Sequence, residues 1–598
     1  MRTATTTGVS ERRESMTFDS GTIDRYFAWD PQEDEEYRDN ITGTGTIGGK
    51  GRSLLFAMRR LRESGEALLD QVEITTSTFF GVGVFHDFLS NVPHLDSLLG
   101  ARDPDLLENA FLSTPLPAYA VRAVEKYLST MTDPVVVRSS SRLEDSLKHS
   151  FAGKYMSTFL INGADQSLSE RVDSVVEQMK RIYARTYFPT AGSYRKKHGL
   201  PEDEMGLILM RMAGKWRGKY FYPAMAGVGF SRNYRRWTTR IRAEDGVLRI
   251  VFGLGTLSTK RGYARTFSLS NPMLRPEGLN PFNIMRHSQE AFQAVGLEEK
   301  QLLTLNITRS WKEIIPHVPN FRLYAQIYNP DNFGGYFTYI GSYPSFQSDS
   351  SKICFSFEDF PCRHKPFFDI MRRLLPFLED AMGVPADLEF AYEPVDQKLQ
   401  LLQCRPLWKG EGSGTGAKPD LEGRKILFRA DRMVTNGYAE GIPYLVYIDH
   451  RVYALTSQFY EIARGLGSIN AKLEGKQFIL AAPGRVGSSN PQLGVPVKYN
   501  ELTNCRCIVE IGIPKMGFMP ELSYGTHFFS DLEVDDVLYM PVYDGERNNV
   551  FDEPALDDSP YELGPHPAIR IYRGSFSVYT SGDDNEGIVV QDAMYPHI

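Results

Sequence analysis

The sequence has little cysteine, no long apolar segment and no excess of positive charge. Its 598 residues include five cysteines, an odd and sparse set that favours a reduced compartment over a disulfide framework. No run approaches the roughly 18 apolar residues of a membrane span, and the N-terminus lacks the apolar core of a secretory signal. We therefore expect a cytoplasmic protein without a membrane partner.

The charge balance excludes a second class of partner. Lys and Arg total 67 against 74 Asp and Glu, which gives a formal net charge of −7 and argues against general nucleic-acid binding. Hydrophobic residues make up 42% and charged residues 24%, as is ordinary for a globular chain. At about 150 residues per domain, the length predicts three or four domains.

Composition changes along the chain predict its organisation. Residues 1–40 are polar and include the acidic run DPQEDEE at 30–36, which predicts a mobile or peripherally packed arm. From there to about 408, β-branched runs alternate with helical patterns, which indicates an α/β or α+β body. The glycine- and serine-rich residues 409–420 (KGEGSGTGAKPD) predict a flexible linker. The strand- and turn-rich residues 421–598 then predict a smaller, β-rich C-terminal domain.

The first candidate site motif is the stretch GTGTIGGKG at residues 43–51, just before the first strong helical pattern. Glycines let backbone N–H groups approach a phosphate closely, a helix N-terminus adds partial positive charge, and Lys50 supplies a full charge. The spacing is not that of a Walker motif. The alternative is a glycine-rich turn with a solvated lysine.

The second motif is VVVRSSSRLED at residues 135–145, followed by SFAGKY at 150–155. A buried strand that ends in Arg138 and three serines, Ser139 among them, presents a forked donor and small hydroxyl donors to a phosphate. The alternative is a structural ion pair between Arg138 and Glu144 or Asp145.

These motifs resemble, in order, the nucleotide-binding domain of the phosphoenolpyruvate synthase and pyruvate phosphate dikinase family, which rifampicin phosphotransferase shares. Further matches, in the same order, are LMRM (209–212), AGVGFS (226–231), GLGT (253–256), DLEF (387–390) and LLQCRP (401–406). The likeness spans about 40–408. It implies an ATP-grasp fold, with one subdomain expected at 41–240 and a second at 241–408.

The closing motifs indicate a metal site. Asp387 and Glu389 lie two residues apart, so in a strand both side chains point to one face and suit Mg²⁺, which prefers oxygen ligands. The resemblance implies that Glu389, Gln403 and Arg405 contact nucleotide or metal, and we assign the metal to Glu389 and Gln403. Two positions depart from the family pattern: Thr256 replaces a glutamate, and Met210 replaces a glutamine.

The C-terminal part decides the reaction. The family's dikinases carry a swivelling domain with a phosphorylatable histidine and then a barrel, but roughly 180 residues are too few for both, since a barrel needs ~250. We therefore expect no TIM barrel. The stretches NGYAEG (436–441) and YGTH (524–527) loosely resemble the swivelling domain, which makes His527 a candidate phosphoacceptor. Phe528 and Phe529 favour the alternative of a histidine packed between aromatic residues.

One further loop is a candidate binding site, since APGRVGSS (482–489) offers glycines, serines and Arg485 to a phosphate or an acidic group. An ordinary surface turn is the alternative.

The sequence thus predicts an ATP- and Mg²⁺-dependent phosphotransferase of the dikinase type, acting on an unidentified small molecule or protein. Lys50, Arg138 and His527 are the expected catalytic residues. The expected nucleotide-binding residues are Lys50, Arg138, Ser139, Glu389, Gln403 and Arg405. The rival hypotheses are a direct kinase and a non-catalytic nucleotide sensor.

Overall fold

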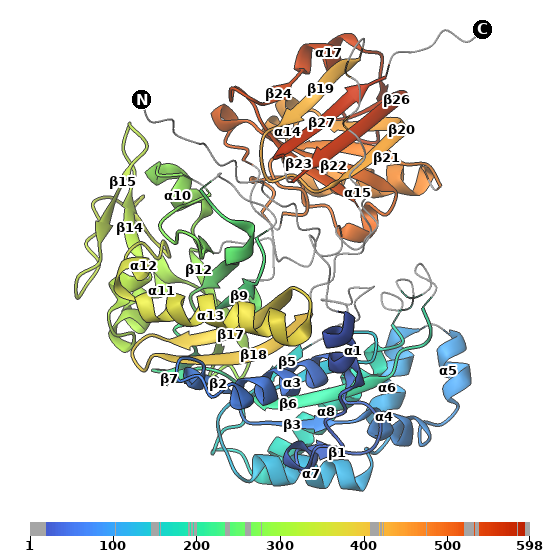
Figure 1. The fold of residues 1–598 in the computed structure, drawn as a ribbon, viewed down its shortest axis with the longest axis vertical. Coiled ribbons are helices and arrows are strands. Elements are labelled where there is room, and N and C mark those ends of the chain that lie inside the picture. Colours follow the sequence, from blue (N-terminus) through green and yellow to red (C-terminus); the bar gives the residue numbers. More distant parts are fainter. Residues whose placement is uncertain are drawn as a thin grey trace, which may run out of the picture.

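A computed structural model of the chain describes residues 20–592 with interruptions. The residues left out of that range are 102, 145–154, 156, 189–191, 193–194, 196–199, 234–239, 258–264, 277, 407–417, 419–420, 422–423, 474, 489, 520–531, 533–536 and 583. His527 and nearly all of the predicted linker therefore lie outside the described residues. In Figure 1 a large body formed by the first two-thirds of the chain lies below a smaller C-terminal body.

The first sheet of the large body has the strand order β1-β3-β6-β4-β5. Its strands are β1 (Ile41–Thr42), β3 (Ser77–Phe80), β4 (Val135–Ser141), β5 (Ser157–Leu160) and β6 (Met205–Arg211). Its helices are α3 (Gly48–Ser64), α4 (Val82–Leu89), α5 (Leu95–Ala101), α6 (Pro104–Ser113), α7 (Ala118–Leu128) and α8 (Leu168–Arg185). Val135 and Val137 pack against α6–α8, and Val136 joins the cluster that contains α3. The sheet is therefore buried on both faces, as its continuous apolar runs predict.

Residues 20–38 differ from the expected arm. They form α1 (Ser20–Ala28) and α2 (Glu35–Arg38), whose Tyr26 and Tyr37 are fully buried in the core with α3. The Tyr26 hydroxyl lies 2.6 Å from Ser53 Oγ, and Arg62 of α3 pairs with Glu36 of the acidic run. The tyrosines and this ion pair attach the segment to the body, whereas composition alone indicated an arm that was either mobile or peripherally packed.

The second part of the large body is built on the sheet β11-β10-β9-β17-β18-β2. Its strands are β2 (Val72–Ile74), β9 (Met225–Phe230), β10 (Val247–Val251), β11 (Arg265–Ser268), β17 (Ala386–Glu393) and β18 (Lys398–Pro406). Beside it are β7 (Lys215–Arg217), β8 (Tyr220–Tyr222), β12 (Ala291–Gly296) and β13 (Leu302–Asn306) in one sheet, and β14 (Gln326–Asn329), β15 (Tyr336–Tyr339) and β16 (Lys352–Cys354) in another. The helices are α10 (Pro281–His287), α11 (Ile307–Ile314), α12 (Phe360–Arg363) and α13 (Lys365–Met382).

The division between the two parts lies earlier than the expected boundary at residue 240. Strand β9 pairs with β10 and β17, so it belongs to the second sheet, and β7 and β8 also follow the last strand of the first. Strand β2 joins the second sheet from within the first part, and the chain then crosses to the second part after Arg211, at the end of β6. Long-range strand pairing, which local sequence does not encode, sets this boundary.

The C-terminal body is one curled sheet with helices against it. Its strands are β19 (Lys425–Ala430), β20 (Gly437–Ile448), β21 (Phe478–Pro483), β22 (Cys505–Gly512), β23 (Leu538–Tyr543), β24 (Val550–Phe551), β25 (Glu562–Leu563), β26 (Ile569–Ser581) and β27 (Glu586–Gln591). Strands β20 to β23 are parallel neighbours, and β26, β27 and β19 continue the sheet with antiparallel pairing. Its helices are α14 (His450–Leu455), α15 (Phe459–Lys472) and α17 (Glu553–Asp558).

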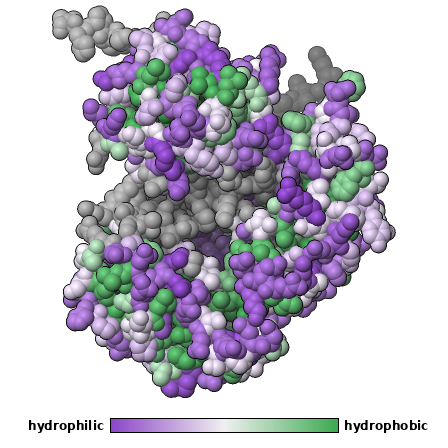
Figure 2. Space-filling view, turned by 180° about the vertical axis from the view of Figure 1, so that it is seen from behind, coloured by the Kyte–Doolittle hydropathy of each residue, from purple (hydrophilic) through white to green (hydrophobic). Residues whose placement is uncertain are grey.

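The fold class is the expected one: a mixed α/β body followed by a smaller, β-rich domain, with no TIM barrel among the described residues. Across that same part of the chain, no helix is both long and apolar enough to cross a bilayer. Figure 2 shows the rear face, where hydrophilic residues predominate and hydrophobic residues lie in small separate groups.

Candidate functional site

A cavity of about 420 Å³ lies between the two sheets of the large body. Residues of α3, β4 and β6 line it on one side, and residues of β9, β17 and β18 line it on the other. Five of the six residues predicted to bind nucleotide are in its wall: Lys50, Arg138, Glu389, Gln403 and Arg405. The structure thus brings together side chains that are separated by up to 355 positions of sequence (405 − 50).

Lys50 reaches the cavity from the first turn of α3. The glycines that were expected to form a loop before the helix form its first turn instead. Only glycine fits at position 48, because its φ is +78° and a Cβ there would lie 1.6 Å from the Ser140 carbonyl oxygen. The Ser140 hydroxyl accepts from Gly51 N at 2.9 Å and donates to the Ile47 carbonyl at 2.7 Å. These contacts fix the N-terminus of α3 against β4, where it can face an anion.

The Lys50 ammonium is held in place by two buried groups of β4 and the turn after it. Its Nζ donates to Glu144 Oε1 at 2.7 Å and to Ser139 Oγ at 3.3 Å. Ser139 is fully buried and is not in the cavity wall, so it supports Lys50, whereas we expected it to touch nucleotide directly. Glu144, which sequence reasoning treated as a partner for Arg138, lines the cavity and pairs with the lysine.

Arg138 connects the two sheets across the cavity. From β4 it donates through Nη2 to Glu389 Oε2 at 2.8 Å on β17, and through Nη1 to the Leu402 carbonyl at 3.0 Å on β18. It also donates to Gln403 Oε1. The register between β17 and β18 shifts next to Glu389, and Leu402 has no ladder partner there. This β-bulge leaves the Leu402 carbonyl able to accept from the guanidinium.

The second sheet presents its polar residues in two adjacent rows. Asp387 pairs across the strands with Phe230 and Arg405, and Glu389 pairs with Val228 and Gln403. Cross-strand partners share one face of a sheet, so both carboxylates point to the same side, as their spacing predicts.

The two carboxylates differ in electrostatic setting. Arg405 donates from Nε to both Asp387 oxygens at 2.8 and 2.7 Å. Burial raises the pKa of Asp387, and Arg405 offsets this only in part. Burial also opposes ionisation of Glu389, but Arg138, and then Lys50 and Arg405, outweigh it and hold the pKa of Glu389 below its ordinary value. Glu389 is therefore an ionised oxygen donor.

Three of the four basic residues in the wall pair with its carboxylates: Lys50 with Glu144, Arg138 with Glu389 and Arg405 with Asp387, while Arg211 pairs with Asp133 outside the wall. A polyphosphate entering the cavity would draw the three cations toward itself and free the Glu389 carboxylate. That exchange suits a nucleotide that arrives with a divalent cation.

The cavity wall offers few oxygen ligands for Mg²⁺. Glu389 and Gln403 lie opposite each other on β17 and β18 and supply carboxylate and amide oxygens. The described residues hold no group of three or more His, Cys, Asp or Glu side chains suited to a metal. One or two protein oxygens fit Mg²⁺ bound mainly through nucleotide phosphates and water, and do not fit an all-protein site.

Beyond the polar rows, the cavity becomes apolar. Ala213, Ala226, Val251 and Ala391 form a buried cluster of small side chains, with Leu402 packed against it. Ala226 pairs with Ala391 two residues along from the row that contains Glu389, which places this cluster about 7 Å further along the strands. Of these residues, Ala213, Ala226 and Leu402 line the cavity, and such an apolar slot beside a charged region is suited to the flat face of a base.

The C-terminal domain packs against the same sheet. Its Met433 and Tyr543 form a buried cluster with Val228, Phe230 and Val247 of β9 and β10. Val228 and Phe230 also line the cavity, and Phe230 pairs with Asp387. The C-terminal domain therefore lies next to the Asp387–Arg405 end of the site.

A second, polar contact joins the two bodies through the loop 482–489, for which the sequence left open a phosphate-binding loop or an ordinary surface turn. The Arg485 guanidinium is buried and lies 2.6 Å from Nδ1 of His287 at the end of α10. Burial, and then the charges of Arg485 and Arg286, hold the pKa of His287 well below its usual value, so its ring is a neutral acceptor. The Gly484, Arg485 and Gly487 N–H groups donate to carbonyls. This loop is an interdomain contact in the structure.

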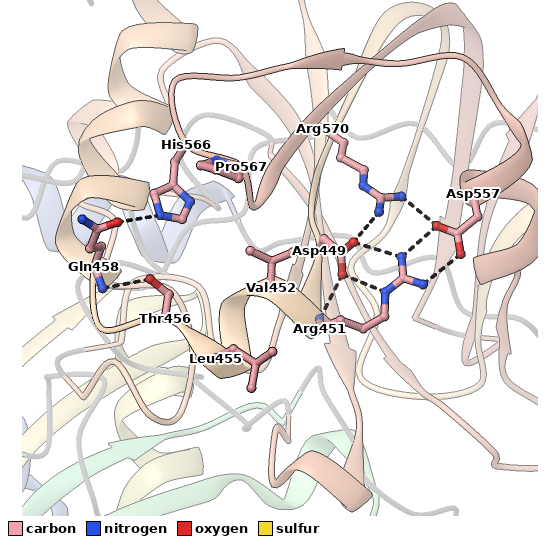
Figure 3. Close-up of a pocket in the computed structure, with 10 residues that line it drawn as sticks. All are labelled: Asp449, Arg451, Val452, Leu455, Thr456, Gln458, Asp557, His566, Pro567 and Arg570. Carbon is pink, nitrogen blue, oxygen red and sulfur yellow. Dashed lines mark hydrogen bonds and ion pairs between the residues drawn. The ribbon is translucent and has the colours of Figure 1, made fainter.

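Another pocket lies on the C-terminal domain and is shown in Figure 3. Its volume is about 590 Å³, and its polar wall holds Arg451 and Arg570. Both arginines pair with Asp449 and with Asp557. None of the six predicted nucleotide-binding residues lines this pocket, whereas five of them line the cavity between the sheets, so we place the nucleotide in that cavity.

Two facing sheets with a cationic cavity between them define a nucleotide-binding protein of the ATP-grasp type. Residues 44–422 match the family model described as pyruvate phosphate dikinase, AMP/ATP-binding domain. The match covers more than half of the chain, so the protein belongs to this family, as the sequence motifs predicted. Comparison with curated proteins gives no match.

Proposed function

We propose that this protein transfers a phosphoryl group from ATP, with Mg²⁺, to an acceptor reached through the C-terminal domain. The observation that carries the proposal is the convergence of three cations and two adjacent carboxylates on one cavity of the AMP/ATP-binding domain. Phosphoryl transfer needs chiefly positioning and neutralisation of charge, which such a wall supplies.

Each residue has a distinct role in this proposal. Lys50, at the start of α3, and Arg138, on β4, contact the phosphates from the first sheet, and Arg405 contacts them from the second. Glu389 and Gln403 hold Mg²⁺, which when bound neutralises phosphate charge and orients the transferring group. Arg138 exchanges its contact with Glu389 for a phosphate oxygen, so nucleotide binding and metal binding are coupled. Ser139 and Glu144 keep the Lys50 ammonium directed at the cavity.

The family match favours the dikinase type of reaction, and the position of the C-terminal domain is compatible with it. Met433 and Tyr543 lie against the strands that carry the proposed phosphate end of the site, so a group on this domain need travel only a short way to the nucleotide. His527 remains the candidate relay. In this scheme a histidine nitrogen attacks the β-phosphorus of ATP and takes the pyrophosphoryl group, so that AMP leaves. Water or inorganic phosphate then removes the outer phosphoryl group, and the histidine passes the remaining phosphoryl group to the acceptor.

A direct kinase is the second candidate. The same docking would allow the C-terminal domain to present a hydroxyl or guanidino acceptor straight to the γ-phosphate, with ADP as the product. A non-catalytic nucleotide sensor would form neither product at a useful rate.

The test is to incubate the full-length protein with Mg²⁺ and labelled ATP, with and without candidate acceptors, and to resolve AMP from ADP. AMP together with an acid-labile, base-stable phosphoryl group on the protein supports the dikinase type. His527→Ala should lose that group. ADP without a protein adduct, and normal turnover in His527→Ala, would replace the relay by the direct kinase.

A further inference from the structure

Thr256 and Gln293 form a hydrogen-bonded pair in the wall of the nucleotide cavity. Thr256 lies in the short 3₁₀ helix Gly255–Leu257, and its hydroxyl donates to Gln293 Oε1 on β12. Gln293 Nε2 in turn donates to Thr304 Oγ1 at 3.2 Å on the neighbouring strand β13. Thr304 is exposed and is not part of the cavity wall. All three side chains are uncharged, and sequence reasoning assigned a role to none of them.

The hydrogen-bonding groups that this pair leaves available match a hydroxyl group. The Thr256 hydroxyl uses its one hydrogen to donate to Gln293, so only its lone pairs remain, and these can accept a hydrogen bond. The Gln293 amide has one N–H directed to Thr304 and a second N–H still able to donate. A phosphate offers only acceptors, whereas a hydroxyl both donates and accepts and can engage both groups together.

The position of the pair agrees with that match. The 3₁₀ helix follows β10, whose last residue, Val251, pairs with Ala226 in the apolar cluster of small side chains. Leu254 N donates to the Gln293 carbonyl at 3.0 Å. Gly253 adopts φ +83°, and a Cβ there would lie 2.8 Å from the same carbonyl. The turn therefore fixes Thr256 in the cavity wall, just beyond the end of β10 that joins the apolar cluster.

We infer that Thr256 and Gln293 bind the ribose hydroxyls of the nucleotide and so select ribonucleotides over deoxyribonucleotides. The inference rests on the proposed nucleotide site: with the base on the small apolar residues and the phosphates at the charged rows, the ribose lies between them, beside this pair. The sequence departs from the resembled family pattern at this point, where a glutamate is expected. Thr256 replaces that carboxylate with an uncharged group, and Gln293 supplies the donor that a carboxylate lacks.

The inference is tested by equilibrium binding of ATP, 2′-deoxy-ATP and 3′-deoxy-ATP to the full-length protein in the presence of Mg²⁺. The wild type should bind ATP roughly two- to tenfold more tightly than at least one deoxy analogue, the usual range for one net hydrogen bond at a partly exposed site. Thr256→Val and Gln293→Leu should weaken ATP binding to the level of that analogue and leave the analogue's own affinity unchanged. Thr304→Val is the matched control and should retain most of the preference.

Equal affinity of the wild type for all three nucleotides would overturn the inference while leaving ATP binding, and the proposed function, intact. Equal weakening of ATP and of both deoxy analogues in Thr256→Val would also overturn it, because a general loss of packing would then explain the change. Absence of any ATP binding to the wild type would overturn both the inference and the proposed function. The wild-type comparison needs no variant to fold, so it decides the question even where a substitution destabilises the protein.

Discussion

Replacing Arg138 by alanine removes the cation that joins the two sheets across the nucleotide cavity. Its guanidinium reaches Glu389 Oε2 at 2.8 Å and the Leu402 carbonyl at 3.0 Å, with the side chain only 12% exposed. A preorganised donor of this kind at the reacting charges typically contributes ~10²- to 10³-fold in turnover, or about 3–4 kcal/mol. We expect Arg138→Ala to lose that much ATP turnover at saturating ATP.

Arg138→Lys is the matched control. It keeps the charge but replaces a forked donor by a compact point charge, so it cannot reach Glu389 and Leu402 with the same geometry. Its single-turnover rate of ATP consumption should fall between those of the wild type and Arg138→Ala. Near-normal turnover in Arg138→Ala, with folding verified by circular dichroism, would refute the assignment of this residue to the phosphates.

The same substitution should change the response to acid. The folded-state pKa of Glu389 is lowered because Arg138 and the other cations outweigh burial. A carboxyl group with a lowered pKa contributes stability above its unfolded pKa, near 4.5, and loses it as the pH falls through the folded value. Arg138→Ala should lack that acid-linked contribution. Thermal unfolding of both proteins from about pH 7 to pH 3 measures the difference, and parallel curves would contradict the reasoning.

Three further predictions follow from named contacts. Glu389→Gln should raise the Mg²⁺ concentration needed for half-maximal turnover about tenfold or more, because an amide lacks the carboxylate charge; an unchanged midpoint would exclude it as a ligand. Arg485→Ala should loosen the attachment of the C-terminal domain, and acid should do the same in the wild type. The lowered pKa of His287 gives a stabilising contribution that is present above about pH 6.5 and is lost as the pH falls. Small-angle scattering at roughly pH 7.5 and 5.5 measures this loosening, and identical curves would contradict it. Gly48→Ala should cost more than about 2 kcal/mol of stability. The control Gly65→Ala is also at positive φ, but an added Cβ would meet nothing within 4 Å, so it should cost only about 1 kcal/mol. Equal melting temperatures of the two variants would contradict the steric argument.

The sequence predicted those parts of the site that lie within one strand. The two-residue spacing of Asp387 and Glu389 is sufficient to place both carboxylates on one face, and Gln403 and Arg405 follow the same rule. Lys50 and Arg138 are 88 residues apart (138 − 50). Local patterns assigned each of them to phosphate binding, but only the family resemblance linked them to one site.

The remainder depends on contacts between distant segments. Ser139 lies beneath Lys50 because β4 packs against the start of α3, which no spacing in either segment reveals. Gln293 carries no motif and enters the cavity wall only because β12 lies beside the turn after β10. The expected boundary at residue 240 was wrong for the same reason, since β9 joins the second sheet through pairing with β10 and β17.

A structure of the protein with Mg²⁺ and a non-hydrolysable ATP analogue tests the central claim most directly. We predict the triphosphate between Lys50, Arg138 and Arg405, the metal on Glu389, and the base on the small apolar residues around Ala226. A nucleotide bound outside the cavity between the two sheets, with the Arg138–Glu389 pair intact, would contradict the account.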